Sequence, residues 1–409
     1  MSFPTTLELS SCGTLPLVSA GVLVYLCVVR ALRRGRFNAV HKRYAAKWEA
    51  KTRTVDEAQE IMKLGTTYDM PFLLEYALSF ALFKTYAIPT ISKLLYDTRQ
   101  LGSDENVARR FADTGLLIST WMACPLSGQA LGKESENDPR ASLALARVNW
   151  LHSKYNISNG DYLYTLALFI LEPITWAKRY GWRELSPLEQ YATFIFWAEV
   201  GRKMNIKDIP ESLEDLMAWT EAYEKEFMVP AQTNHDVARC TTGELLFTVP
   251  HAFGLRRFLE GFSRALLEDR VRIAMMEPEA PRYATSIVPF LLNLSAFIQK
   301  HLLLPRSRPS DLIQVDLPKA SPIAPRMFVS KPWYKPRRRG LGSLLDRAFV
   351  WIGWHSDVPG PEYRSDGYRI HELGPLRYEK EGHEKVFSMA AQMQGCPVAD
   401  AWKAEKKEK

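Results

Sequence analysis

The 409-residue sequence contains few cysteines, and their arrangement excludes two classes of protein. Its five cysteines are scattered and form no Cys-x-x-Cys pair. Neither a zinc site built on paired cysteines nor a disulfide framework is therefore supported, and a reducing compartment is the simpler setting. The 22 glycines and 25 prolines follow no period, which excludes collagen-like and low-complexity chains.

Catalytic motifs that can be recognised by their spacing are also missing. The sequence has no Gly-rich dinucleotide fingerprint, no phosphate-binding P-loop, no Gly-x-Ser-x-Gly elbow and no His-Glu-x-x-His pair. Nucleotide-dependent transfer and serine hydrolysis are therefore disfavoured. Alternating apolar and polar residues, which are typical of strands, are scarce.

Excess positive charge is confined to the N-terminal part of the chain. The formal net charge is +7, but residues 1–53 hold nine lysines and arginines and only two acidic residues. That leaves 44 residues of each sign in residues 54–409. A domain that binds nucleic acid carries its positive excess across the fold, so we expect no nucleic-acid partner.

An apolar run near the N-terminus predicts a membrane anchor. Residues 15–29 carry no charge, and the basic residues Arg30, Arg33, Arg34 and Arg36 follow directly. Under the positive-inside rule this order predicts a lumenal tail at 1–13, a single transmembrane signal anchor at 14–32 and a cytosolic juxtamembrane stalk at 33–65. A cleaved signal peptide is the alternative, but it carries its positive charge before the apolar run.

Residues 66–304 read as an all-α domain. Helices are expected at 140–156, 161–179, 187–204, 211–227, 251–276 and 283–303, with Pro89 separating two earlier ones. Ser186 and Glu189 form a capping box with a proline at the first helical position. Ser103, followed by two acidic residues, is expected to cap a helix that ends near Met122.

Residues 305–409 differ in character and form a Pro-rich C-terminal extension. Prolines recur through 305–336 and exclude a long helix there. A short amphipathic helix is expected at 341–354, with a basic cluster before it and tryptophans towards its end. Such a helix either contacts a membrane surface or packs on the domain, and the sequence leaves both open.

Two groups of residues could carry chemistry. Arg110, Asp113 and Thr114 share one helical face, and His152 lies on the apolar stripe of a later helix, where an imidazole could ligate haem iron. Taken alone, Arg110 and Asp113 at this spacing are more typical of a surface ion pair, and a lone histidine such as His152 is more often a core residue than a ligand. The second group, His355 and Asp357 with His371 or His383, has the spacing of a non-haem iron triad but lacks the strands that normally support one.

Four segments resemble a known family. Residues 80–92, 110–114, 147–155 and 161–169 are similar to those of the MpaB-type ER-bound oxygenases of fungi and the bacterial rubber oxygenases, also called latex-clearing proteins. The resemblance spans the anchor and most of residues 60–300. It implies a globin-like helical domain that binds haem b and uses dioxygen to cleave isoprenoid carbon–carbon double bonds.

The resemblance also assigns residues. It implies that His152 is the axial haem ligand, that Arg147 in the same motif contacts the cofactor, and that Arg110 and Thr114 lie on the oxygen side. Asp113 replaces the lysine of the latex enzymes, so that lysine's role does not carry over. The implied protein is an oxygenase of the endoplasmic reticulum membrane, acting on a lipophilic, prenylated small molecule. The alternatives are a haem hydroxylase or epoxidase, or a non-catalytic haem-binding or scaffold protein; the oligomeric state is not determined by the sequence.

Overall fold

The computed structural model describes residues 11–50, 54–101, 106–128, 137–246, 255–311, 313, 323, 331–352, 355–399 and 402. These residues confirm an all-α protein, because the only extended pairing among them is of isolated bridges such as Ile323 with Tyr368. The helices before the first long loop are α1 (Ser11–Leu32), α2 (Gly35–Glu49), α3 (Val55–Lys63), the π-helical turn η1 (Leu64–Asp69), α4 (Pro71–Thr85), α5 (Pro89–Asp97) and α6 (Val107–Ala123). The following ones are α7 (Arg140–His152), α8 (Asn159–Tyr180), α9 (Pro187–Lys203), α10 (Leu213–Phe227), α11 (Gln232–Leu245), α12 (Leu255–Ala265), α13 (Asp269–Ala274) and α14 (Arg282–His301). The C-terminal part adds α15 (Leu341–Trp351), α16 (His383–Gln394) and three short 3-10 turns, η3 (Pro361–Tyr363), η4 (Ile370–Glu372) and η5 (Leu376–Tyr378).

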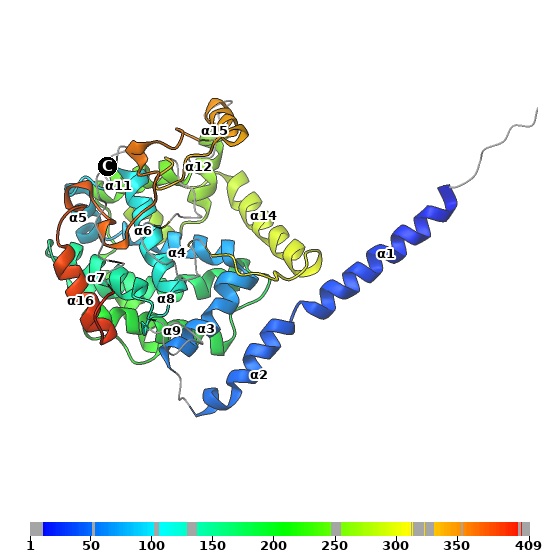
Figure 1. The fold of residues 1–409 in the computed structure, drawn as a ribbon. Helices are drawn as coiled ribbons and strands as arrows, with labels where there is room; N and C mark the ends of the chain where they lie inside the picture. The colour runs from blue at the N-terminus through cyan, green and yellow to red at the C-terminus, as the bar shows by residue number, and fades with distance from the viewer. Residues whose placement is uncertain are drawn as a thin grey trace, which may run out of the picture.

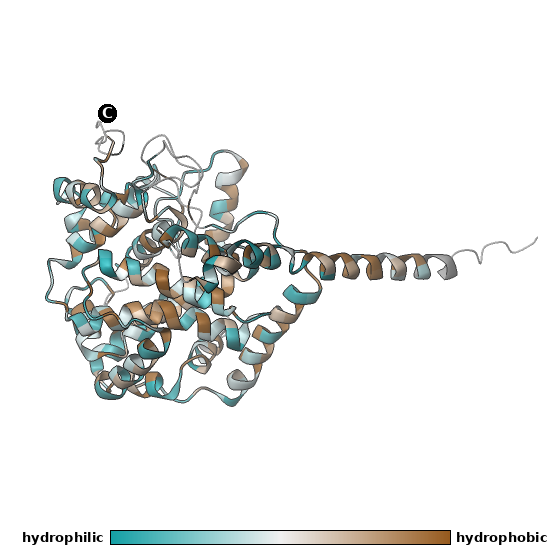
Figure 2. Ribbon diagram, turned by 90° about the horizontal axis from the view of Figure 1, so that it is seen from below, coloured by the Kyte–Doolittle hydropathy of each residue, from teal (hydrophilic) through white to brown (hydrophobic). Residues whose placement is uncertain are grey.

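Helix α1 projects away from the rest of the molecule (Figure 1). Among the described residues, one helical stretch, Pro16–Glu49, is long and apolar enough to cross a bilayer, and only 6% of its most apolar window is buried. The apolar colouring of α1 where it leaves the domain is plain in Figure 2. This helix corresponds to the anchor expected at 14–32 and begins at Ser11, within the tail expected at 1–13. Residues 1–10 of that tail lie outside the described residues.

The segment expected to be a stalk is held against the domain. Tyr44 of α2 and Ile61 of α3 are buried in one apolar cluster with Leu188 of α9. His41 also lies 2.8 Å from the Ser186 hydroxyl, through its Nε2. Helices α2 and α3 therefore form part of the folded body and place the C-terminal end of α1 at its edge.

Several helix ends lie where the capping residues and prolines in the sequence predicted them. The capping box at Ser186 and Glu189 is confirmed, and Pro89 begins α5 as expected. Helix α7 ends at His152 rather than continuing to 156; Ser153 stands at its C-cap and donates to the Trp150 carbonyl at 2.7 Å. The cap expected at Ser103 lies outside the described residues.

The single helix expected over 251–276 is wrong. The described part of this range forms two helices, α12 and α13, separated at Glu268, whose backbone is extended. The carboxylate of Glu268 reaches Lys84 at 3.2 Å, so a tertiary ion pair coincides with the break in the helical pattern. Residues 251–254 lie outside the described part of the chain.

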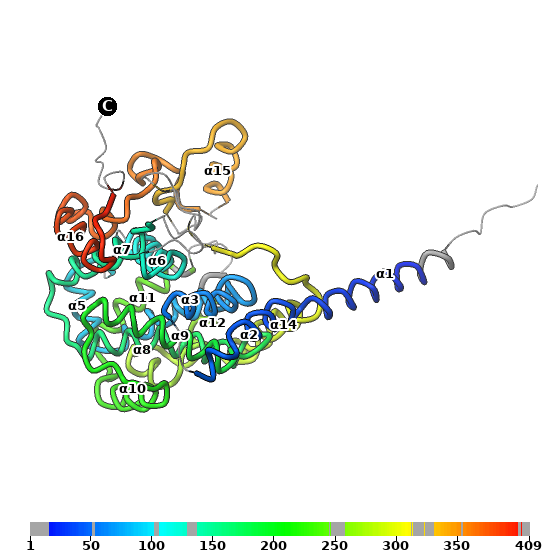
Figure 3. Tube along the Cα trace, turned by 60° about the horizontal axis from the view of Figure 1, so that its bottom comes forward, coloured from blue at the N-terminus to red at the C-terminus, as the bar shows by residue number. Residues whose placement is uncertain are grey.

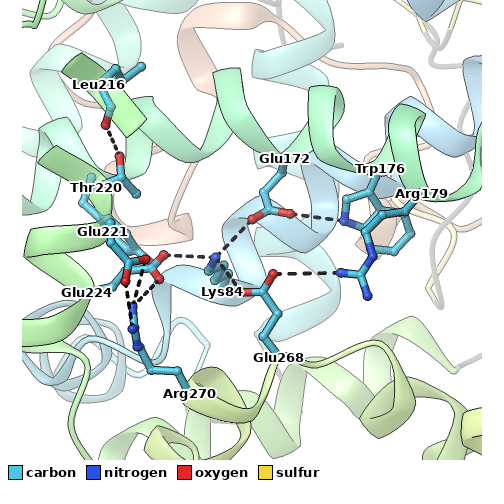
Figure 4. A network of polar contacts seen from close by, with 11 residues as sticks. Lys84, Glu172, Trp176, Arg179, Leu216, Thr220, Glu221, Glu224, Glu268 and Arg270 are labelled. Carbon is cyan, nitrogen blue, oxygen red and sulfur yellow. Dashed lines mark hydrogen bonds and ion pairs between the residues drawn. The ribbon is translucent and has the colours of Figure 1, made fainter. Parts of the chain in front are cut away.

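A buried cluster of charges joins the helices that surround the centre of the domain (Figure 4). The Lys84 ammonium of α4 lies 3.3 Å from Glu172 of α8, 3.0 Å from Glu224 of α10 and 3.2 Å from Glu268. Burial alone would lower the pKa of Lys84, but the three carboxylates outweigh it and raise that pKa above its ordinary value. Arg270 also pairs with Glu224 at 3.3 Å, so the cluster ties α10 and α13 to α4 and α8.

The C-terminal extension is not a separate unit. Helix α16 packs on α7, and Arg147 of α7 donates to three backbone carbonyls in residues 373–381. Helix α15 instead leaves its apolar side uncovered, with Leu341 81% and Trp351 87% exposed. That exposure fits a surface contact rather than packing on the domain; Trp354 lies outside the described residues.

Candidate active-site cavity

The main cavity of the domain has a volume of ≈730 Å³ and runs along α6. Helices α4, α5, α7, α8 and α9 complete its walls, which are mainly apolar and include Leu78, Leu82, Phe111, Ile118, Leu151, Leu166, Phe169 and Trp197. The rings of Phe169 and Trp197 stack with centroids 4.7 Å apart. A cavity of this size and character suits a lipophilic ligand or a large flat cofactor.

His152 lines the cavity from the last turn of α7. Its Nδ1 atom is buried and has no hydrogen-bond partner among the residues that the structure describes. Burial, and secondarily the charge of Arg110, lower the pKa of His152 to about 4. The ring is therefore neutral at physiological pH, which is the form that binds a metal ion.

Arg110 and Thr114 reach the same cavity from α6. They lie one helical turn apart, so both project from one face, together with Phe111 between them. The influence of Arg110 on the His152 pKa indicates that its positive charge acts on the cavity near the imidazole. The structure thus brings together three residues that the sequence had singled out, two from α6 and one from α7.

Asp113 does not line the main cavity. It is 1% exposed, lies towards the C-terminal segment, and accepts hydrogen bonds from the Tyr334 hydroxyl at 2.5 Å and the Gly374 amide at 3.1 Å. Its ion-pair partner is Arg109 at 3.5 Å rather than Arg110. The expected face shared by Arg110, Asp113 and Thr114 is thus divided, because on α6 the carboxylate points to the side that packs against residues 334 and 374.

Burial raises the pKa of Asp113, although the charge of Arg109 and the Tyr334 hydrogen bond act to lower it. The carboxylate lines a separate hollow of ≈100 Å³, which shares Arg110 and Pro375 with the main cavity. Asp113 therefore lies beside the main cavity, and its hydrogen-bond partners come from the C-terminal segment.

Arg147 also lies outside the cavity. Its guanidinium is fully buried and donates to the carbonyls of Leu373, Tyr378 and Glu381 at 2.8, 2.7 and 2.9 Å. Burial lowers its pKa to about 10, so the group stays charged at neutral pH. The contact with a cofactor expected for Arg147 is not what its geometry supports, because its donors are directed to these three carbonyls.

The C-terminal segment supplies parts of the site that the sequence did not identify. Pro375 lines the main cavity, and Gly374 before it has a φ of 119°. A Cβ atom at Gly374 would lie 2.8 Å from the Leu151 side chain, so only glycine fits this close approach. The adjacent Gly and Pro are a recognisable turn signal, but nothing in the sequence places that turn beside His152.

The alternative iron triad is not assembled. Among the described residues, no cluster of three His, Cys, Asp or Glu side chains could hold a metal ion. Asp357 accepts a hydrogen bond from Tyr363 at 2.6 Å, and His371 packs against His383 with ring centroids 4.7 Å apart. The imidazole in the cavity is thus the better candidate for a metal ligand.

An all-α protein with an apolar cavity, a neutral histidine and a cation in its wall is suited to oxidising a lipophilic molecule. The model of the family described as "ER-bound oxygenase mpaB/B'/Rubber oxygenase, catalytic domain" matches residues 69–292. The chain belongs to this family and is an oxygenase.

Three relatives give the extent of the similarity. The ER-bound oxygenase mpaB' of Penicillium brevicompactum is 30% identical over 93% of this chain and 92% of its own length. The ER-bound oxygenase mpaB of Penicillium roqueforti (strain FM164) is 35% identical over 64% of this chain and 90% of its own length. The mpaB protein of Penicillium brevicompactum is 33% identical over 57% of this chain and 61% of its own length.

Proposed function

We propose that this protein is a membrane-anchored, haem b-dependent oxygenase that cleaves a carbon–carbon double bond of a lipophilic, prenylated small molecule with dioxygen. The observation that carries the proposal is the meeting of His152, Arg110 and Thr114 in one mainly apolar cavity of ≈730 Å³. Cleavage of the double bond with both oxygen atoms retained yields two carbonyl products.

The residues present fit a haem. His152 offers an imidazole that is neutral because its pKa is lowered to about 4, and its Nδ1 has no competing partner in the described part of the chain. An imidazole in an apolar helical pocket is a common axial ligand of haem iron, and the apolar walls suit the macrocycle. When bound, haem supplies the binding and reductive activation of dioxygen.

Arg110 supplies a fixed positive charge at the oxygen side of the cavity. In surroundings of low polarity, a preorganised cation stabilises the negative charge that develops as dioxygen is reduced. The hydroxyl of Thr114, one turn further along the same face, donates a hydrogen bond to the same region. The apolar side chains around them exclude water and hold the hydrocarbon substrate.

Asp113 and Arg147 position the site rather than contact the reactants. Asp113 holds Tyr334 and Gly374, and Arg147 holds the carbonyls of residues 373, 378 and 381. Together these contacts fix the turn that carries Pro375 into the cavity wall. Their loss is expected to loosen the C-terminal segment before it affects the chemistry.

The proposed location is the endoplasmic reticulum membrane, with a lumenal N-terminus and a cytosolic catalytic domain. All three relatives described above are named as ER-bound, and α1 is apolar, exposed and followed by arginines. A lipophilic substrate dissolved in the same bilayer would reach the enzyme without crossing water.

The visible spectrum of the purified full chain tests the proposal. The wild type is expected to show a Soret band, and His152→Ala to lose it while keeping its helical circular dichroism. His235→Ala is the matched control, because His235 is half-buried on α11 and does not line the cavity. Full haem content in His152→Ala, or no haem in the wild type, would refute the assignment.

A further inference from the structure

The outer side of α14 is apolar over its whole length. Residues 283–299 include no charged side chain. Its large apolar side chains facing outward are Tyr283, Ile287, Phe290, Leu291, Leu294 and Phe297, of which Phe290 is 64% and Phe297 54% exposed. Their spacing of three or four residues places them in one stripe. A surface helix in water normally carries charged residues on this side, so the stripe marks an interaction surface.

Most of the stripe is not the face by which α14 packs on the domain. Tyr283 at its N-terminal end is the exception, because its ring stacks on Phe258 of α12 with centroids 4.8 Å apart. Ala284 and Val288 are buried on the other side of the helix, and Leu292 and Ala296 pack against the clusters around Phe80 and Trp182. Helix α14 therefore has two apolar faces, of which one is covered by the domain. The stripe itself is largely exposed in the part of the chain that the structure describes.

The chain at the C-terminal end of α14 is hydrogen-bonded to the C-terminal half of α1 and to the residues that follow it. The Tyr25 hydroxyl of α1 donates to the Leu302 carbonyl at 2.8 Å, and Arg33 donates to the carbonyls of Lys300 and Leu303. Arg36 donates to the Arg306 carbonyl at 2.9 Å. Figures 1 and 3 show α14 at the side of the domain from which α1 leaves, and Figure 1 shows it running across the direction of α1.

Positive charges surround this junction. Arg30 on α1 and Arg34 just before α2 are exposed, as are Lys300 and Arg308 beyond the stripe. Basic side chains at the edge of an apolar surface are placed to meet anionic lipid headgroups while the apolar residues enter the acyl region. In α14, as in α1, an uncharged apolar surface is thus followed by basic residues at its C-terminal end.

We propose that the outer stripe of α14 docks on the lipid bilayer, in the leaflet that receives the basic end of α1. The partner is a phospholipid surface that contains anionic headgroups. This inference rests on the membrane anchoring in the proposed function. A helix that crosses the bilayer at α1 brings α14 to the surface, because hydrogen bonds fix the ends of both helices to one another.

Docking on this side would also bring part of the cavity wall towards the lipid. Thr66 and Pro71 line the cavity together with Ser310, whose amide donates to the Thr67 carbonyl at 2.9 Å. Ser310 follows closely after the residues that receive α1, and the neighbouring Phe72 is 69% exposed. A substrate that leaves the bilayer here would move along α6 towards Arg110 and His152.

Fluorescence quenching on the full chain in vesicles tests the docking. The vesicles contain phosphatidylcholine and phosphatidylserine, and Cys12, Cys27 and Cys396 are replaced by alanine. A single nitrobenzoxadiazole label is placed at Phe290→Cys, Phe297→Cys or Leu294→Cys. The control is Met217→Cys, because Met217 is 55% exposed and its helix, α10, lies away from α1 in Figure 3.

Doxyl-labelled lipid is expected to quench the α14 labels about threefold more strongly than the label at 217, with the reverse order for aqueous iodide. Equal quenching at all positions by iodide would overturn the proposal. Protection of the α14 labels from both quenchers would overturn it too, because a protein surface, such as a second copy, would then cover the stripe. The Soret band of the same samples tests the haem assignment separately. If the band is absent but the lipid still quenches the α14 labels, the haem assignment is refuted and the docking proposal stands.

Discussion

The Tyr334 hydroxyl donates a hydrogen bond to the buried Asp113 carboxylate at 2.5 Å, across 221 residues of sequence. This contact joins the Pro-rich C-terminal extension to the helix that carries Arg110 and Thr114. The same carboxylate accepts from the Gly374 amide at 3.1 Å, next to Pro375 in the cavity wall. Asp113 thus belongs to the support of the cavity.

A pair of substitutions at Asp113 distinguishes support from proton transfer. Asp113→Ala leaves Arg109 buried with a lost partner and is expected to cost about 3–5 kcal/mol of stability. Asp113→Asn keeps an acceptor for Tyr334 and is expected to retain haem and turnover within about tenfold. A general base replaced by an amide would lose on the order of a hundredfold or more, so such a loss in a folded Asn variant, measured as product formed per haem, would contradict the supporting role.

Arg110 is expected to act on dioxygen without holding the cofactor. Arg110→Ala should therefore keep its Soret band but lose on the order of a hundredfold in turnover, the scale for removal of one preorganised donor. Arg109→Ala provides the matched comparison on the neighbouring position, since Arg109 faces Asp113 and Glu379 instead. Normal turnover in Arg110→Ala, measured by oxygen uptake, would remove this residue from the site.

The charge cluster around Lys84 should be costly to break. Lys84→Met leaves Glu172 buried without its cation and Glu224 with Arg270 alone. It is expected to destabilise the fold by about 3–5 kcal/mol. Lys93→Met, which breaks an exposed pair with Asp97, should cost less than about 1 kcal/mol. Thermal unfolding followed by circular dichroism measures both.

The loss of folding stability in Lys84→Met, relative to the wild type, should become smaller in mild acid. Burial raises the pKa of Glu172 even beside Lys84, and loss of the ammonium removes an opposing influence. The folded variant therefore binds protons more readily than the unfolded chain, and its stability relative to the wild type rises as the pH falls. A deficit that stayed constant between neutral pH and the carboxylate range would argue against protonation of the buried acids.

His371 should make the fold sensitive to acid. Burial, followed by the charges of His383, Arg369 and Arg147, lowers its pKa to about 3 from an ordinary value of 6.5. Between those values the unfolded chain binds a proton that the folded protein does not. The free energy of unfolding therefore decreases as the pH falls through this window, by about 1.4 kcal/mol per pH unit from this group. His371→Asn should flatten that slope in urea titrations compared with the wild type, whereas an unchanged slope would show that other groups control it.

The orientation of the anchor can be read from sealed microsomes. Protease added outside should digest the chain beyond about residue 55, because the arginines after α1 favour a cytosolic domain. The sequons at Asn156 and Asn293 are both on exposed residues, so they would be modified if the domain were lumenal. Glycans at either position would reverse the proposed orientation.

The sequence by itself determined the helical class, several helix ends and the candidate cavity residues on α6 and α7. These follow from local rules: apolar spacing, a capping box at Ser186, a proline at 89 and an uncharged run before a basic cluster. The sequence also shows that α14 lacks charged residues over most of its length. It does not show which of the two apolar faces of this helix the domain covers, because periodicity describes only the helix itself.

The tertiary structure decided what each polar residue does. Helical spacing placed Asp113 with Arg110 and Thr114, but packing turned it to Tyr334 and Gly374, more than 200 residues away. Arg147 likewise took three backbone carbonyls as partners, and Glu268 interrupted an expected helix beside its ion pair with Lys84. These partners come from segments that are distant in the sequence. A buried charged group must be paired with whichever groups the fold places beside it, whereas local periodicity describes only the helix to which the residue belongs.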